Sequence, residues 1–77
     1  MNEFDRLRRT AEMYRRTFPP STRVRLVQMF DPHPVPPNTE GTVIFVDDLG
    51  QIHVEWDNGS TLALNSECDR FRKIKTE

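Results

Sequence analysis

A few side chains of this 77-residue chain are of the types that perform nucleophilic catalysis or bind metals. Cys68, His33 and His53 could supply a nucleophile and a base, but none lies in a local signature of such a site. Asp47 and Asp48 add carboxylates, yet these residues lack the paired spacing of a CxxC, HxxxH or EF-hand site. The three glycines do not form a phosphate-binding loop. The sequence therefore predicts a protein that is not an enzyme and that has no metal site and no cofactor.

A second group of residues favours binding over catalysis. Trp56 is the only tryptophan, and residues 31–38 hold four prolines in eight positions, which predicts a stiff, extended loop. In a groove beside this loop Trp56 could hold a peptide or a base, whereas pointing inward it would anchor the core. Its companions in the groove would be Phe30, His33 and Phe45. We take Phe30, His33 and Trp56 as the predicted protein-binding or peptide-binding residues.

The charges are segregated along the chain. Residues 1–25 carry seven arginines against three acidic residues, residues 26–69 carry eight acidic residues and no Lys or Arg, and residues 70–77 are again basic. Basic clusters of this kind can contact phosphate, although the net charge of -1 argues against nucleic acid as the main partner. The alternative, nucleic-acid-binding site consists of Arg8, Arg9, Arg15, Arg16, Arg23, Arg25, Arg70, Arg72 and Lys73.

The N-terminal segment is predicted to be an amphipathic helix over residues 2–17. Asn2 is a suitable N-cap, and Pro19-Pro20 ends the helix. The apolar residues recur every three or four positions and share one face: Phe4, Leu7, Ala11, Tyr14 and Phe18. We expect this face to dock on the rest of the domain or on a second copy, which would make a homo-oligomer. The alternative is a basic arm that becomes ordered on a partner.

The remaining chain reads as short strands with turn signals between them. Strict alternation fails within Val27–Phe30, which predicts a bulge or a strong bend, and Gly41 suggests a bend or a close backbone approach. Asn58-Gly59 predicts a type I′ hairpin turn, and residues 65–69 predict a single 3₁₀ turn. The five expected strands are Thr22–Phe30, Glu40–Val46, Gln51–Asp57, Ser60–Leu64 and Phe71–Lys75.

This order predicts a mainly β protein, a five-stranded SH3-like barrel with an N-terminal α-helix and a short 3₁₀ turn before the last strand. We assign residues 1–18 to the helix and residues 19–77 to the barrel. The first and last strands lie together in such a barrel, so the basic ends of the chain are expected to form one face. The acidic middle strands, with Trp56, would then form another face.

A set of segments in the strand-rich part of the chain forms a recognisable pattern: Ser21-Thr22-Arg23-Val24-Arg25-Leu26-Val27, Asp31-Pro32, Pro37-Asn38-Thr39-Glu40-Gly41-Thr42-Val43 and Val46-Asp47-Asp48-Leu49-Gly50-Gln51-Ile52-His53-Val54-Glu55-Trp56-Asp57-Asn58-Gly59-Ser60, with Leu62 and Leu64. Over roughly residues 19–75 this pattern resembles a small bacterial and phage family known only as domain of unknown function 4314. The resemblance implies, weakly, an origin in bacteria, phages or mobile elements, and it supplies no catalytic residues.

We therefore expect a non-catalytic interaction module whose partner is a protein or peptide. Nucleic-acid binding through the basic face is one alternative. A phage-borne inhibitor of host defence is another, motivated by the acidic residues 31–69 and by the implied origin. The chain has no apolar run long enough to span a membrane and no signal-peptide pattern, and its one cysteine suits a reducing compartment, so we expect a cytoplasmic location.

Overall fold

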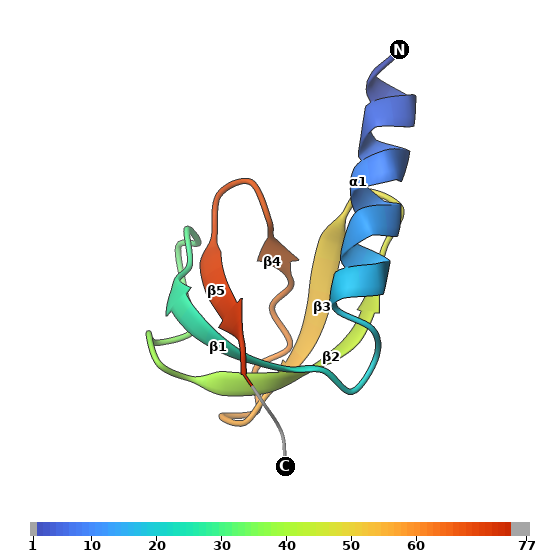
Figure 1. The fold of residues 1–77 in the computed structure, drawn as a ribbon. Helices are drawn as coiled ribbons and strands as arrows, with labels where there is room; N and C mark the ends of the chain where they lie inside the picture. Colours follow the sequence, from blue (N-terminus) through green and yellow to red (C-terminus); the bar gives the residue numbers. More distant parts are fainter. Residues whose placement is uncertain (1, 75–77) are drawn as a thin grey trace.

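The computed structural model describes residues 2–74 as one helix followed by five antiparallel strands (Figure 1). These are α1 (Glu3–Thr17), β1 (Arg23–Gln28), β2 (Glu40–Val46), β3 (Gln51–Trp56), β4 (Leu64–Asn65) and β5 (Arg70–Lys73). The prediction of a mainly β protein with an N-terminal helix is confirmed. Within residues 2–74, the helix is too short and too polar to cross a membrane.

All five strands belong to one sheet in the order β4-β3-β2-β1-β5. The last strand pairs with the first, with Arg72 opposite Arg25, so the prediction that these strands are neighbours is confirmed. The two edge strands, β4 and β5, do not pair with each other. The sheet is therefore not closed, and the predicted barrel is not confirmed.

The core lies on one face of this sheet, where alternate residues of the central strands are buried. Trp56 is 1% exposed, and its indole N–H donates a hydrogen bond of 2.9 Å to the carbonyl of Leu62. Gly41 is opposite Trp56 in the register, and a Cβ there would lie 2.8 Å from the indole. The close approach expected at Gly41 is confirmed, because the tryptophan ring occupies the space that a side chain would need.

The two hairpin turns share one geometry, which differs from the type I′ turn expected at Asn58-Gly59. The carbonyl of Trp56 accepts a hydrogen bond from Gly59, and the N–H of Trp56 donates to Ser60. Only Gly59 has a positive φ, of 91°, so the turn is a three-residue connection that ends in a glycine bulge. Asp47–Gln51 repeats the pattern, with Gly50 at a φ of 82°. The type I′ prediction was wrong because one left-handed residue suffices.

The C-terminal third also departs from the predicted boundaries. β4 is shorter than expected, because residues 60–63 are not in the sheet. Within this segment the carbonyl of Leu62 accepts a hydrogen bond from the Trp56 side chain. Residues 65–69 form a hydrogen-bonded turn instead of a 3₁₀ helix, with Asn65 O accepting from both Cys68 N and Asp69 N. The last strand begins one residue early, at Arg70, and Lys75 lies outside the described residues.

Helix α1 docks on this same chain through its C-terminal half. Ala11 is fully buried, and Phe18 packs on Phe71 of β5 with ring centroids 5.3 Å apart. Asn2 caps the helix, as predicted, by accepting from Asp5 N. The N-terminal half extends past the turn that joins β2 and β3 (Figure 1). The apolar face predicted from the sequence is therefore covered at one end only.

Candidate functional site

A bulge in the central strand β2 turns two large apolar side chains outward. Val43 faces Val54 and Phe45 faces His53, so Ile44 is the extra residue between two regular pairs. Ile44 is 45% exposed and Phe45 is 48% exposed, while Val43 and Val46 on either side are buried. The bulge therefore gives this part of β2 an apolar outer surface.

Phe45 is held in a fixed orientation by the neighbouring strand. Its ring stacks on the imidazole of His53, with centroids 4.2 Å apart and planes at 7°. His53 Nε2 in turn donates to Asp47 Oδ2 at 2.9 Å. The other carboxylate oxygen of Asp47 accepts from the N–H groups of Leu49 and Gln51. One carboxylate thus fixes both the β2–β3 turn and the ring against which Phe45 stacks.

These hydrogen bonds affect the acidity of Asp47. Partial burial alone would raise its pKa, but the hydrogen bond from His53 and those from two backbone N–H groups outweigh that effect. The pKa of Asp47 therefore lies below its ordinary value. Asp47 is ionised at neutral pH, and its charge keeps the Nε2–H of His53 directed at it.

A small pocket adjoins Phe45 at the point where α1 ends. It has a volume of about 180 Å³ and is lined by Arg15, Phe18, Pro20, Phe45 and Val46. The Arg15 guanidinium holds α1 against the end of β2 and the turn that follows. It donates a hydrogen bond to the carbonyl of Val46 at 3.1 Å and pairs with Asp48 at 2.7 Å. We define the Phe45 surface as the exposed residues Pro20, Ile44 and Phe45 together with the half-buried Phe18 and His53 beside them.

The predicted contact residues Phe30, His33 and Trp56 do not form one exposed surface. Trp56 is buried in the core, so its indole is inaccessible to a partner, and the structure supports the core interpretation of this residue. Phe30 and His33 are exposed on the loop after β1. Their roles as contact residues remain predictions that do not involve Trp56.

Phe30 is positioned by a residue that the sequence reasoning missed. Asp69 is buried, and its two carboxylate oxygens accept from the N–H of Phe30 and the N–H of Asn65, each at 2.8 Å. This side chain joins the start of the proline-rich loop to the turn before β5. An aspartate just before a strand gives no sequence signal for a contact with a residue 39 positions away.

The nine basic residues of the alternative site do not form one free basic face. Arg15, Arg23 and Arg25 pair with carboxylates, and Lys73 donates to the carbonyl of Thr17 at the end of α1. The others make no ion pair with any of residues 2–74: Arg8, Arg9, Arg16, Arg70 and Arg72.

Pairing between distant segments also overturns the expected separation of basic and acidic faces. Arg23 of β1 binds both carboxylate oxygens of Asp57, at 2.9 and 2.6 Å, and also contacts Glu40. The hydrogen bond from Arg23 lowers the pKa of Asp57 below its ordinary value, against the opposing effect of burial. The segment after Trp56 therefore lies beside the first strand, whereas the sequence analysis placed it on a different face from that strand.

The residues considered for catalysis are dispersed. Cys68 is exposed on the turn before β5, His33 is on the proline-rich loop, and His53 is paired with Asp47. Among residues 2–74, no three His, Cys, Asp or Glu side chains gather in a way that could hold a metal ion. Asp47 accepts hydrogen bonds within the β2–β3 turn, and Asp48 pairs with Arg15 of α1.

The bulge that exposes Ile44 beside Phe45 was missed, although the sequence carries a signal for it. Val43-Ile44-Phe45-Val46 is a run of four apolar residues, and a strand with one buried face can bury only every second residue. The same failure of alternation correctly predicted the bulge of β1, where the register shifts between Leu26 and Gln28. A bulge was thus predictable in β2 as well.

Comparisons with known proteins place the chain in a family but supply no function. No curated protein and no solved structure matches it. A family model matches residues 7–74, which is most of α1 and every strand of the sheet. Because the match begins at residue 7, it includes the part of α1 that packs on the sheet. The helix and the sheet therefore belong to the same family domain. The chain therefore belongs to the family described as domain of unknown function (DUF4314).

Proposed function

We propose that this protein is a non-catalytic binding module and that it contacts a protein or peptide through the Phe45 surface. The observation that carries the proposal is the bulge at Ile44, which exposes two consecutive large apolar side chains on a central strand. Apolar and aromatic side chains on a rigid element are typical anchors of protein interfaces. Completing the burial of Phe45 alone would contribute roughly 1 kcal/mol to a complex.

The surroundings of Phe45 favour a protein over a nucleic acid. The carboxylates of Asp47 and Asp48 lie at the adjoining turn, and Glu55 follows His53 on the same outward face of β3. Negative charges at this position repel a phosphate backbone. A protein partner that offers apolar side chains to Phe45 and a basic side chain to Glu55, which makes no ion pair with any of residues 2–74, fits the surface best.

Fewer observations support the other hypotheses. The arginines of the first strand no longer support nucleic-acid binding, because Arg23 and Arg25 form ion pairs with Glu40 and Asp57. An origin in phages or mobile elements, and inhibition of host defence, rest on the resemblance and on the acidic residues alone.

We also propose that the sheet is SH3-like. The support is that β1 to β4 are neighbours in sequence order and that β5 returns to pair with β1.

Photo-crosslinking in the native host tests the proposal. A benzophenone amino acid at position 45 keeps an aromatic ring in place, and the matched control carries the same group at position 27. Val27 is an exposed apolar residue on the bulge of β1, with 43% of its surface accessible. We expect a discrete protein adduct from position 45 and none of the same mass from position 27.

Two outcomes contradict the proposal. Position 45 yields no adduct, or positions 45 and 27 yield the same adducts in the same amounts, which would indicate non-specific contact. Crosslinking of position 45 to nucleic acid would instead support the alternative function. Circular dichroism of both proteins confirms in advance that the substitutions leave the fold intact.

A further inference from the structure

The projecting half of α1 leaves a second apolar surface uncovered. Phe4 is 75% exposed, and Leu49 on the β2–β3 turn is exposed opposite the helix. Together with Leu7 they line a groove of about 410 Å³ between α1 and that turn. We call Phe4, Leu7 and Leu49 the helix groove. Ile44 and Phe45 do not line it, and of its lining residues only Arg15 also lines the pocket beside Phe45.

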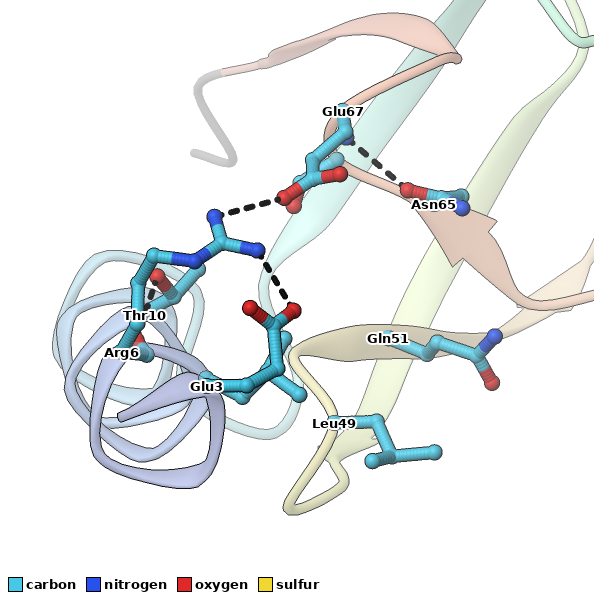
Figure 2. A pocket seen from close by; sticks show the side chains of 9 residues that line it. Glu3, Arg6, Thr10, Leu49, Gln51, Asn65 and Glu67 are labelled. Carbon is cyan, nitrogen blue, oxygen red and sulfur yellow. Dashed lines mark hydrogen bonds and ion pairs between the residues drawn. The ribbon is translucent and has the colours of Figure 1, made fainter.

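The helix groove is held open because other contacts fix the helix. Arg6 lies between two carboxylates, at 2.8 Å from Glu3 and 3.4 Å from Glu67 of the turn before β5 (Figure 2). Further along α1, Thr10 and Ala11 lie against Gly50, where a Cβ would be 3.5 Å from Thr10 Cγ2. The contact at Gly50 sets the distance between α1 and the β2–β3 turn, and the contact with Glu67 holds α1 beside the turn before β5. The apolar side chains of the groove are thus presented in advance of binding.

The charges at the rim of the helix groove indicate what covers it. Arg15 and Asp48 pair with each other across the rim. Arg8 and Glu12, the other two charged residues of the rim, make no ion pair with any of residues 2–74. They have opposite charges, both are exposed, and they are one helical turn apart.

This arrangement is complementary to itself. If a second α1 lies antiparallel to the first, across a two-fold axis level with residue 10, each Arg8 is opposite the Glu12 of the other copy. A two-fold interface of this kind uses the same residues twice. The net charge of -1 leaves little long-range repulsion between two copies. Each projecting half of α1 then lies along the docked half of the other helix.

We propose that the helix groove is the interface of a two-fold homodimer, in which Phe4 and Leu49 of each copy are buried and Arg8 pairs with Glu12 of the other copy. A peptide of unrelated sequence would have to match both the apolar groove and the alternating rim charges. A second copy of this chain matches them by symmetry.

Charge reversal gives a test that does not depend on fold stability. The proposed interface holds two pairs, each made of position 8 of one copy and position 12 of the other. In a dimer of Arg8→Glu both pairs consist of two carboxylates, and in a dimer of Glu12→Arg both pairs consist of two guanidinium groups. Sedimentation equilibrium should show each variant alone dimerising about tenfold more weakly than the wild type. An equimolar mixture should recover the wild-type affinity to within about threefold, as a heterodimer, because opposite charges face each other again.

Apolar substitutions provide a matched pair on the same helix. Met13 is exposed like Phe4 but does not line the helix groove. Phe4→Ser should weaken dimerisation by about tenfold or more, whereas Met13→Ser should change it by less than about twofold. Both residues are exposed, so neither change should unfold the protein.

The proposal is overturned if the wild type sediments as a monomer up to about 500 μM, a concentration at which even weak homodimers form. It is also overturned if the two charge variants fail to recover affinity on mixing, or if Met13→Ser weakens the dimer as much as Phe4→Ser does. A monomer would show that a second copy does not cover the groove.

Discussion

The two ends of the β2–β3 pair place their aromatic residues on opposite faces of the sheet. At one end Gly41 faces Trp56, the register is regular, and the indole is buried. At the other end the bulge at Ile44 shifts the register, and Phe45 stacks on His53 at the surface. The comparison shows that one extra residue decides whether a strand contributes an aromatic ring to the core or to the outer surface.

The regular end should be the more sensitive to substitution. Trp56→Ala removes the largest buried side chain and leaves a cavity, which should cost about 3–5 kcal/mol, a large part of the stability of a domain this size. Chemical denaturation followed by circular dichroism would measure it, with Trp56→Phe as the milder control. A variant that unfolds at the same denaturant concentration as the wild type would contradict the burial of Trp56.

Gly41→Ala tests the same end from the opposite strand. The added methyl group would lie 2.5 Å from Val54 Cγ1 and 2.8 Å from the Trp56 ring, so the core must shift. We expect a loss of about 1–3 kcal/mol, or roughly 5–20 °C in Tm for a small domain. Gly59→Ala does not serve as a control because Gly59 has a positive φ. Ser21→Gly serves as the control, because Ser21 is exposed and has a φ of 77°, which glycine adopts without strain. This substitution should preserve or raise the Tm.

Asp47→Asn tests how the bulged end is fixed. Asparagine keeps the acceptor for the turn but loses the charge that faces His53, so we expect a loss of about 1 kcal/mol at pH 7. Because folding lowers the pKa of Asp47, its contribution is present above the ordinary value of 3.8 and disappears as the pH falls below it. The difference in stability between wild type and variant should therefore shrink below pH 3.8. A difference that stays constant with pH would contradict this.

Phe45→Ser should have the smallest effect on stability. The ring is half exposed, so its replacement should cost about 1 kcal/mol or less, mainly by loss of the stacking on His53. Thermal denaturation would compare it with Val27→Ser on the bulge of β1. A loss as large as that of Trp56→Ala would mean that Phe45 belongs to the core.

The sequence predicted the parts of this fold that depend on local pattern. The helix, its cap at Asn2 and the close approach at Gly41 follow from periodicity and from single residue types, and the pairing of the first and last strands follows from the order of the elements. The bulge of β2 was missed because its four apolar residues were read as a regular strand. The same reading hid Phe45, which the sequence had named only as a companion of Trp56.

The charges were misread for a different reason. Runs of like charge along the chain suggested separate basic and acidic faces, but a sheet brings together residues that are far apart in sequence. Arg23 and Asp57 are 34 positions apart and form a bidentate pair. Asp69 reaches Phe30 across 39 positions. Contacts of this length depend on register, which periodicity alone does not determine.

The most direct test of the proposed function is quantitative co-purification from the native host with three proteins: wild type, Phe45→Ser and Val27→Ser. The Tm values of the two variants are measured first and must be similar. Mass spectrometry then compares the proteins that each of the three captures. The proposed function predicts at least one protein that the wild type and Val27→Ser capture equally and that Phe45→Ser loses by about tenfold or more. Capture of the same proteins in the same amounts by all three would contradict a binding role for the Phe45 surface.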